Sequence, residues 1–228
     1  MKKFLVVAIA AAIPSLILAH GDVTPQAMDT SALPDVGEDW HFENPYRGSD
    51  TFDLAIKVGA SGYNQNCARC HGLGGVSGGL APDLRMLEAN ESGDEWFAER
   101  FRFGYTQNGI TKMPGFDQIL DQKAAWAIRS YLEVRPADGA LEPFDAELRA
   151  IHEQLVAWSE AGDSAAVHGN EIDAIRSKLS EITGQIKTAS GAETADSVVS
   201  QALAALDGSE NSLKNAAEIM TVGMSAAK

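Results

Sequence analysis

The stretch NQNCARCHGLGG (residues 64–75) contains both cysteines of the 228-residue chain. Cys67 and Cys70 are separated by two residues, and His71 follows the second cysteine directly. A cysteine pair with this spacing serves three kinds of chemistry in proteins: a disulfide, a metal site, or covalent attachment of haem. The rest of the sequence has to distinguish between these three uses.

The N-terminus predicts the compartment. Two lysines precede an apolar run over residues 4–18, and the small residue Ala19 comes before a change to polar sequence. This is the pattern of a secretory signal peptide, which we predict over residues 1–19. The run is short for a membrane span of about 20 residues, although an uncleaved anchor remains an alternative. We therefore expect an exported, periplasmic protein whose mature chain begins near His20 and has no membrane span.

The exported chain is strongly acidic. Removing Lys2 and Lys3 leaves 16 basic and 32 acidic residues, a net charge of −16. Nucleic acid is therefore not expected as a partner, because the chain could not neutralise a row of phosphates. A protein partner would present basic or mixed charge, which acts mainly on the rate of encounter.

The composition changes near Pro136. All four tyrosines and three of the four tryptophans precede it, whereas alanine, serine, glutamate and aliphatic residues dominate the sequence after it. We predict an extended N-terminal segment over residues 20–49, a first domain over 50–136, a linker over 137–144 with proline and glycine, and an acidic helical C-terminal region over 145–228.

The first domain is predicted to be helical with long loops. A short helix is expected over residues 49–59, closed by Gly59. A second is expected over 91–104, where Ser92 and Glu95 have the spacing of a capping box and Gly104 suits a C-terminal cap. A third is expected over 121–134. No run of alternating strand residues is evident, so no sheet is predicted.

The C-terminal region has apolar residues every three or four positions, as expected for amphipathic helices. The breaks in these stripes predict three or four helices, which could form a small bundle, pack on the first domain or associate between two chains. His152 and His168 are expected to face solvent. The stripes comprise Leu148, Ile151, Leu155 and Trp158; Ile172, Ile175, Leu179, Ile182 and Ile186; Val199, Leu203 and Leu206; and Leu213, Met220 and Met224.

Cys67, Cys70 and His71 match the attachment signature of c-type haem. Two thiols one turn apart can each add to a haem vinyl group, and the adjacent histidine then falls under the iron as a ligand. A disulfide oxidoreductase would place the pair in a βαβ setting, and none precedes Cys67. A zinc site would need further ligands, and the other histidines are scattered. A structural disulfide would close a very small loop and contribute little.

Met113 is the candidate second axial ligand. It lies in the stretch TKMPGF, which is rich in proline and glycine and precedes the last aromatic helix. Ligation by methionine and histidine raises the reduction potential of a haem and closes the iron to substrates, the combination wanted for electron transfer. The simpler interpretation is that Met113 fills a gap in the core. Arg69, Arg100 and Arg102 could neutralise the haem propionates or form a docking patch.

Residues 50–135 resemble a class I cytochrome c. The resemblance rests on GASGYNQNCARCH in the first helix, GLAPDL in the haem-side loop, KMPGF in the methionine loop and AAWAIRSYLE in the closing helix. It implies an all-α fold with one covalently attached haem c, iron ligands His71 and Met113, and a Pro82 carbonyl that accepts a hydrogen bond from the proximal histidine. The additional amphipathic helical tail departs from the family pattern.

A narrower resemblance covers residues 19–134, through AHGDVTPQ, ENPYRG, APDLR and DEWF. These stretches are similar to those of periplasmic cytochromes c that accept electrons from PQQ-dependent (quinoprotein) alcohol dehydrogenases. The resemblance implies an electron carrier and not an enzyme, with that dehydrogenase as donor and an oxidase or another cytochrome as acceptor. Two alternatives stay open: a haem enzyme or gas sensor with five-coordinate iron, and a cytochrome tethered to a larger complex, or to a second copy, by its helical tail.

Overall fold

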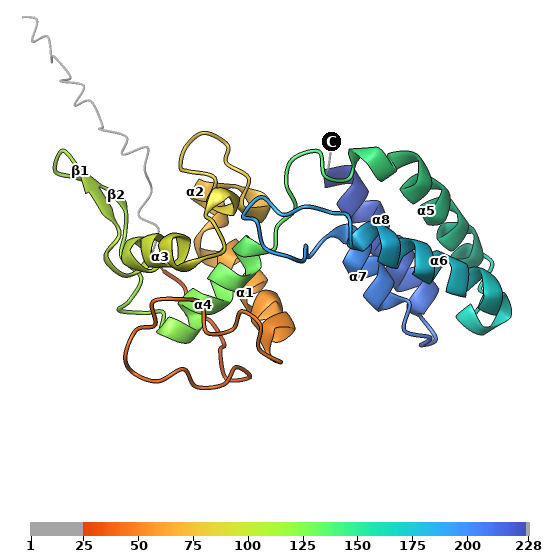
Figure 1. Ribbon diagram of the computed structural model, residues 1–228, viewed down its shortest axis with the longest axis horizontal. Helices are drawn as coiled ribbons and strands as arrows, with labels where there is room; N and C mark the ends of the chain where they lie inside the picture. The colour runs from red at the N-terminus through yellow and green to blue at the C-terminus, as the bar shows by residue number, and fades with distance from the viewer. Residues whose placement is uncertain (1–24, 227–228) are drawn as a thin grey trace, which may run out of the picture.

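A computed structural model describes residues 25–226 of the chain. The predicted signal peptide and His20 lie outside the described residues. The described part contains eight α-helices and one two-stranded antiparallel sheet, so the all-α fold class is confirmed. The α-helices are α1 (Phe52–Asn66), α2 (Ala68–His71), α3 (Glu91–Phe103), α4 (Gln122–Glu133), α5 (Asp145–Glu160), α6 (Gly169–Thr183), α7 (Val198–Ala205) and α8 (Ser212–Ala226). Figure 1 shows two lobes, α1–α4 with the sheet and α5–α8.

The first lobe is built on the contact between α1 and α4. A Cβ atom at Gly59 would lie only 1.8 Å from the backbone oxygen of Ala127, so the missing side chain lets the two helix backbones touch. The prediction that α1 ends at Gly59 is therefore wrong. The helix continues through this glycine to Asn66, because the glycine is there for close packing and not for termination.

Helices α3 and α4 have the predicted extents within one or two residues. The capping box at Ser92 and Glu95 is not the N-terminal cap of α3: the Asn90 side chain accepts a hydrogen bond from the Gly93 amide instead. Asp121 caps α4 in the same way, by accepting from the Ala124 amide. Gly104 follows α3 with φ 70°, a conformation that favours glycine, as the sequence predicted for a C-terminal cap.

Residues 25–51 contain no α-helix or strand and run over the surface of the first lobe. They are anchored by the buried side chains of Leu33 and Tyr46 and by a buried ionic cluster. In this cluster Arg47 donates to Asp94 at 2.8 and 2.9 Å and to Glu133 at 2.7 Å, and Arg129 donates to Asp94 at 2.7 Å. The N-terminal segment is thereby connected to both α3 and α4.

A β-hairpin, which the sequence analysis did not predict, precedes α4. Strands β1 (Tyr105–Gln107) and β2 (Ile110–Met113) are joined by Asn108 and Gly109, with φ of 52° and 73°. Two positive φ angles in an Asn-Gly pair are the signature of a tight hairpin turn. In Figure 1 the hairpin projects from the first lobe.

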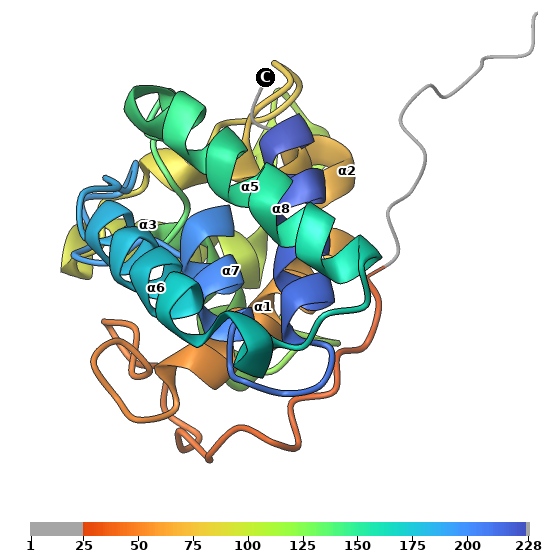
Figure 2. The same cartoon turned by 90° about the vertical axis from the view of Figure 1, so that its right-hand side faces the viewer.

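The second lobe has a hydrophobic core of its own. Helices α5 and α8 lie side by side in Figures 1 and 2, and α7 packs against both α6 and α8. The apolar stripes of the sequence supply this core, which includes Leu148, Leu155, Leu179, Val199 and Met220. The four stripes thus correspond to four helices packed on one another.

Residues 187–196, here called the strap, return from the second lobe to the end of α4. The Ala189 amide donates to the Arg135 carbonyl at 3.1 Å, and the Asp196 amide donates to the Val134 carbonyl at 2.9 Å. Arg135 and Asp196 also form an ion pair. The strap reaches toward α4 in Figure 1, and its backbone pairing fixes the second lobe to the first.

Among the helices formed by residues 25–226, none combines the length and apolar character that crossing a bilayer requires.

Candidate functional site

The cysteine pair lies where α1 ends and α2 begins. The Cys67 amide completes α1 by donating to the Tyr63 carbonyl at 2.8 Å. The amides of Cys70 and His71 both donate to the Cys67 carbonyl, at 3.1 and 2.9 Å. The motif therefore forms one tight helical turn, which holds the two thiols one turn apart with the imidazole immediately after them.

Both thiols are unpaired, so the structure contains no disulfide between them. Burial of the Cys67 thiol, and to a lesser extent charge on Cys70, raises the pKa of Cys67 to about 12. A redox-active cysteine instead needs a lowered pKa, because the thiolate is the nucleophile. Nor do residues 25–226 contain any group of three or more His, Cys, Asp or Glu side chains placed to hold a metal ion. Neither the oxidoreductase nor the zinc alternative gains support.

His71 is buried and has one defined hydrogen bond. Its Nδ1 atom lies 2.9 Å from the carbonyl oxygen of Pro82. A carbonyl oxygen only accepts, so Nδ1 carries the proton and Nε2 carries the lone pair. Burial lowers the pKa of His71, an effect that the Pro82 carbonyl partly opposes. The imidazole is thus neutral at neutral pH, with Nε2 available as a metal ligand.

The turn after His71 requires glycine. Gly72 has φ 81°, and a Cβ atom there would lie 1.9 Å from the Val76 carbonyl oxygen. The Gly72 carbonyl in turn accepts a 2.7 Å hydrogen bond from the Tyr63 hydroxyl. Burial raises the pKa of Tyr63 above its usual value, so this hydroxyl stays protonated and continues to donate.

The loop that carries Pro82 is held by the next residues along the chain. The Asp83 carboxylate accepts from the Arg85 backbone amide at 3.0 Å and from its guanidinium at 3.1 and 2.7 Å. Arg85 also donates to Asp138 at 2.9 Å, in the segment that follows α4. Burial acts to raise the pKa of Asp83, but the hydrogen bonds from Arg85 outweigh it and lower that pKa. The Pro82 carbonyl is therefore presented by a charge-stabilised loop.

Met113 is the last residue of β2, not part of an irregular loop as expected. It is half-buried and packs against the hydrophobic core that also contacts Cys67 and Ala68. The backbone of Met113 passes close to the end of α3 at Gly104. A Cβ atom at Gly104 would lie 2.3 Å from the Met113 carbonyl oxygen, so this close approach requires glycine. The structure thus places Met113 against the same hydrophobic core as Cys67. The strand that carries Met113 was not predicted, although Asn108-Gly109 signals a hairpin.

The three arginines considered for the site differ in their surroundings. Arg69 is exposed. Arg100 pairs with Glu99 at 2.8 Å and stacks on an aromatic ring. Arg102 lies 4.7 Å above the ring of Trp40, and its buried Nε atom has no hydrogen-bond partner within residues 25–226. A buried Nε–H group without an acceptor fits an anionic group such as a haem propionate, so the residues present are compatible with haem.

Comparisons with known proteins agree on the nature of the first lobe. The family model for cytochrome c oxidase, cbb3-type, subunit III matches residues 54–132. The chain is similar to cytochrome c550 of Pseudomonas aeruginosa, with 57% identity over 120 residues that cover 52% of this chain and 83% of that protein. No solved structure gives a significant match.

Two enzymes of Pseudomonas putida share a shorter similarity. Quinohemoprotein alcohol dehydrogenase ADH IIB is 34% identical over 83 residues, 35% of this chain and 11% of the enzyme. Quinohemoprotein alcohol dehydrogenase ADH-IIG is 33% identical over 94 residues, 41% of this chain and 12% of the enzyme. The chain thus matches only a small part of these two dehydrogenases. Its similarity to cytochrome c550, by contrast, extends over most of that protein. The chain therefore belongs to the class I cytochromes c, which are haem c electron-transfer proteins and not enzymes.

Proposed function

We propose that this protein is an exported monohaem cytochrome c that carries single electrons. Cys67 and Cys70 would hold one haem through thioether bonds, and His71 would ligate the iron through Nε2. The observation that supports this most is the hydrogen bond between His71 Nδ1 and the Pro82 carbonyl, 2.9 Å long. It fixes the tautomer and the ring orientation that an axial ligand needs.

Met113 would supply the second axial ligand. With imidazole and thioether as ligands, the haem would supply one-electron transfer and leave no position for a substrate. The residues of the chain would then have three tasks: the cysteines would fix the haem edge, the aromatic core would exclude water, and Arg102 would offer its unpartnered Nε to a propionate. The Arg102 guanidinium carbon lies 4.7 Å from the centroid of the Trp40 ring.

Covalent attachment is tested by the mass of the protein exported with its own leader. We expect the mature chain plus one haem, with the added mass resistant to acid extraction. Cys67→Ala together with Cys70→Ala should remove the covalent haem. A wild-type product without added mass would contradict the proposal.

Ligation by Met113 is tested by absorption spectra and carbon monoxide. The oxidised wild-type protein should show the weak far-red band of sulfur ligation, and the reduced protein should resist carbon monoxide. Met113→Ala should lose the band and bind the gas rapidly. Met86→Ala is the matched control, because Met86 is exposed and lies in the haem-side loop. Rapid binding by the wild-type protein would favour the alternative of a five-coordinate haem enzyme or gas sensor.

The proposed donor is a PQQ-dependent alcohol dehydrogenase, and the proposed acceptor is an oxidase or a further cytochrome. The similarity to parts of two quinohemoprotein alcohol dehydrogenases supports the donor class, because this chain resembles a segment of such enzymes. Rapid mixing of the oxidised cytochrome with a reduced PQQ-dependent alcohol dehydrogenase should show haem reduction in a single exponential phase. Reduction no faster than by an unrelated periplasmic dehydrogenase would contradict this assignment.

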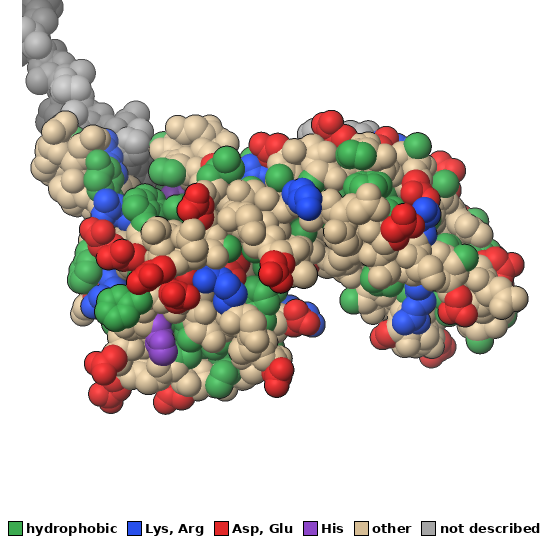
Figure 3. All heavy atoms as spheres, viewed as in Figure 1, with side chains coloured by type: hydrophobic (Ala, Val, Ile, Leu, Met, Phe, Trp, Pro, Cys, Tyr) green, Lys and Arg blue, Asp and Glu red, His purple; other side chains and the backbone are tan. Residues whose placement is uncertain are grey.

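The surface beside the cysteine turn is suited to a transient partner. Leu73 and Leu80 are 78% and 68% exposed, and Val76 lies between them. Acidic side chains (red) recur over both lobes on the face shown in Figure 3, while Lys and Arg are fewer. Apolar contact near the haem edge, with an acidic surface around it, favours a partner of basic or mixed charge. The rate of reduction should accordingly fall as ionic strength rises.

We further propose that residues 145–226 form a separate unit attached to the cytochrome domain. Its own core and the strap that joins it to α4 support this division. Sedimentation of the full-length protein, compared with a version ending at Pro136, shows whether the unit also joins two chains. If the full-length protein and the shortened version are both monomeric, self-association is contradicted. The unit would then serve binding to a different protein.

A further inference from the structure

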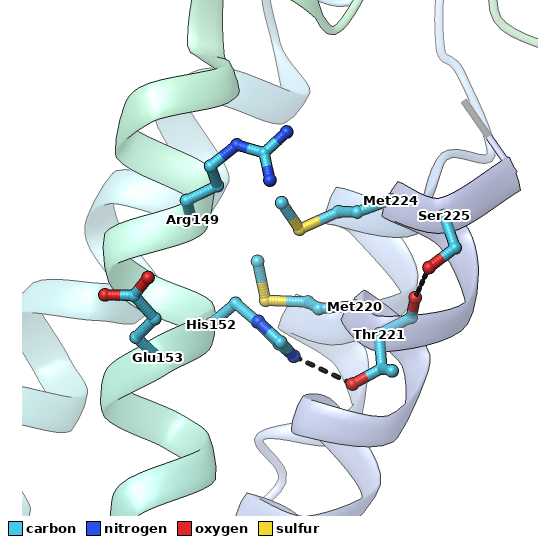
Figure 4. A pocket seen from close by; sticks show the side chains of 7 residues that line it. All are labelled: Arg149, His152, Glu153, Met220, Thr221, Met224 and Ser225. Carbon is cyan, nitrogen blue, oxygen red and sulfur yellow. Dashed lines mark hydrogen bonds between the residues drawn. The ribbon is translucent and has the colours of Figure 1, made fainter. Parts of the chain in front are cut away.

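The interface between α5 and α8 contains a cluster that haem binding does not use. A cavity of about 160 Å³ is lined by His152 of α5 and by Met220 and Met224 of α8. Figure 4 shows the imidazole and both thioethers pointing into the same gap between the two helices. Met220 and Met224 are four residues apart, so their side chains lie on one face of α8. His152 is half-buried here, which corrects the expectation that it faces solvent.

One nitrogen of His152 is left free for a ligand. Its Nε2 lies 2.7 Å from Thr221 Oγ1. That hydroxyl already donates its hydrogen to the Ala217 carbonyl, at 2.8 Å. Thr221 must therefore accept from Nε2, so Nε2 carries the proton and Nδ1 carries the lone pair. Nδ1 itself forms no hydrogen bond with any residue in the described range 25–226.

The donor set selects the kind of metal. Two thioethers and one imidazole are soft or borderline ligands, and thioethers select Cu(I) among biological metals. Zinc instead prefers thiolate, imidazole and carboxylate. The Arg149 side chain also borders the cavity, but its guanidinium is engaged by Asp145 at 2.9 and 2.8 Å. Glu153 of α5 is the other charged residue at the border of the cavity, and its carboxylate points away from the gap in Figure 4. A cation there therefore meets no unpaired positive charge from these side chains.

We propose that His152, Met220 and Met224 form a binding site for a soft monovalent metal ion, Cu(I), in the C-terminal lobe. Nδ1 of His152 and the two thioether sulfurs are the ligands. Thr221 is a positioning residue, because its hydroxyl holds the imidazole in the tautomer that leaves Nδ1 unprotonated. The site is independent of the haem, since its residues belong to α5 and α8 alone.

The first experiment uses the full-length holoprotein labelled with ¹³C in its methionine methyl groups. Silver(I), a soft ion that needs no reducing agent, serves as the probe. We expect the resonances of Met220 and Met224 to shift and saturate at one equivalent. Those of Met28, Met86 and Met113 should stay in place. Shifts that start elsewhere, or no shift at one equivalent, would overturn the proposal without requiring any variant.

Variants then identify the ligands by native mass spectrometry and by competition with a Cu(I) chelator. Met220→Leu with Met224→Leu conserves volume, and should abolish the bound Cu(I) while the haem spectrum stays unchanged. Met86→Leu is the matched control and should retain one Cu(I). Thr221→Val should weaken Cu(I) binding about 10–100-fold, as expected for the loss of a group that orients a histidine ligand.

Two outcomes contradict the assignment even if every variant folds. Equal Cu(I) retention by wild type and the double leucine variant would show that the metal binds elsewhere. Tighter binding of Zn(II) than of Cu(I) or silver(I) would show that the site is not a soft-metal site.

Discussion

The Nδ1 atom of His71 lies 2.9 Å from the carbonyl oxygen of Pro82, although the two residues are eleven positions apart in the sequence. This contact decides which ring nitrogen carries the proton. Together with the lowered pKa that burial gives His71, it leaves a neutral imidazole whose Nε2 can bind iron. A backbone carbonyl cannot be removed by a side-chain substitution. The role of the Pro82 carbonyl is therefore tested by substituting the residues that hold its loop in place.

Replacing Arg85 should loosen that loop. Arg85→Ala removes the guanidinium that binds Asp83 at 2.7 Å and Asp138 at 2.9 Å. We expect the free energy of unfolding at pH 7 to fall by about 2–3 kcal/mol, because a largely buried ion pair loses one partner. The lowered pKa of Asp83 makes this contribution present above about pH 4 and lost as the carboxylate is protonated. Urea denaturation at pH 7 and pH 3 checks both parts. Arg149→Ala, which removes an exposed ion pair with Asp145, is the control and should cost much less than Arg85→Ala.

Neutralising Asp94 should be more damaging. This fully buried carboxylate accepts from Arg129 at 2.7 Å, from Arg47 at 2.8 Å and from the Asn44 amide at 2.9 Å. Asp94→Asn leaves the fully buried Arg129 without a carboxylate partner and Arg47 with Glu133 alone, so we expect a loss of about 3–5 kcal/mol in urea denaturation. Glu99→Gln, in an exposed pair with Arg100, is the control. Equal stabilities for the two variants would show that the cluster contributes nothing specific.

Substituting alanine for glycine should have opposite effects on stability at Gly59, in the contact between α1 and α4, and at Gly169, at the start of α6. Gly59→Ala places a Cβ atom 1.8 Å from the Ala127 carbonyl oxygen, so two helix backbones must separate. We expect a loss of at least about 3 kcal/mol, since overpacking against backbone cannot be relieved by a rotamer change. Gly169→Ala, at the start of α6, meets nothing within 4 Å and should be neutral or stabilise by up to about 1 kcal/mol. Thermal unfolding of the two variants compares them directly.

Tyr46 should make the protein sensitive to alkali. Burial, followed by charge on Asp121, raises the pKa of Tyr46 to about 12. An acid whose pKa is raised on folding stabilises the native state below its unfolded pKa of about 10, and this contribution is lost between about pH 10 and 12. The expected loss is about 2–3 kcal/mol. Tyr46→Phe should reduce the pH dependence of stability in this range, although Tyr63, whose pKa is also raised by burial, still contributes to it. Stability at pH 7 should stay within about 1 kcal/mol of wild type. An unchanged alkaline slope would exclude this residue as the cause.

The proposed axial ligand predicts a change in reduction potential. Met113→His replaces a thioether by a better electron donor and should lower the potential, on the order of 100 mV, because axial ligands are the strongest determinant of haem potential. Met86→His should leave it unchanged, since Met86 is exposed in the haem-side loop. Spectroelectrochemical titration measures both, and a potential unaffected by Met113→His would assign the second axial position to another residue.

The sequence predicts best what depends on neighbours along the chain. The stripe from Leu148 to Leu155 became the buried face of α5, because helical periodicity and burial are linked locally. The cysteine turn was likewise predictable from Cys67 to His71. The hairpin at Asn108 and Gly109 is also encoded locally, but by its turn dipeptide and not by an alternating pattern in its short strands.

Other features depend on contacts between distant segments. Gly59 looks like a helix end in isolation, and only the backbone of Ala127, far along the chain, explains why α1 continues. His168 was expected in solvent, but it stacks on Trp158 with ring centroids 4.0 Å apart and contacts Asp163 at 2.8 Å. Such pairings are decided by tertiary packing, which periodicity does not describe.

The strap has a consequence for how the molecule moves. Backbone hydrogen bonds join it to Val134 and Arg135 at the end of α4, and α4 packs against α1, whose last turn leads into Cys67. These bonds oppose free swinging of the acidic helices about the linker. If the proposed haem is bound as described, a partner that holds the C-terminal helices would also orient the haem edge.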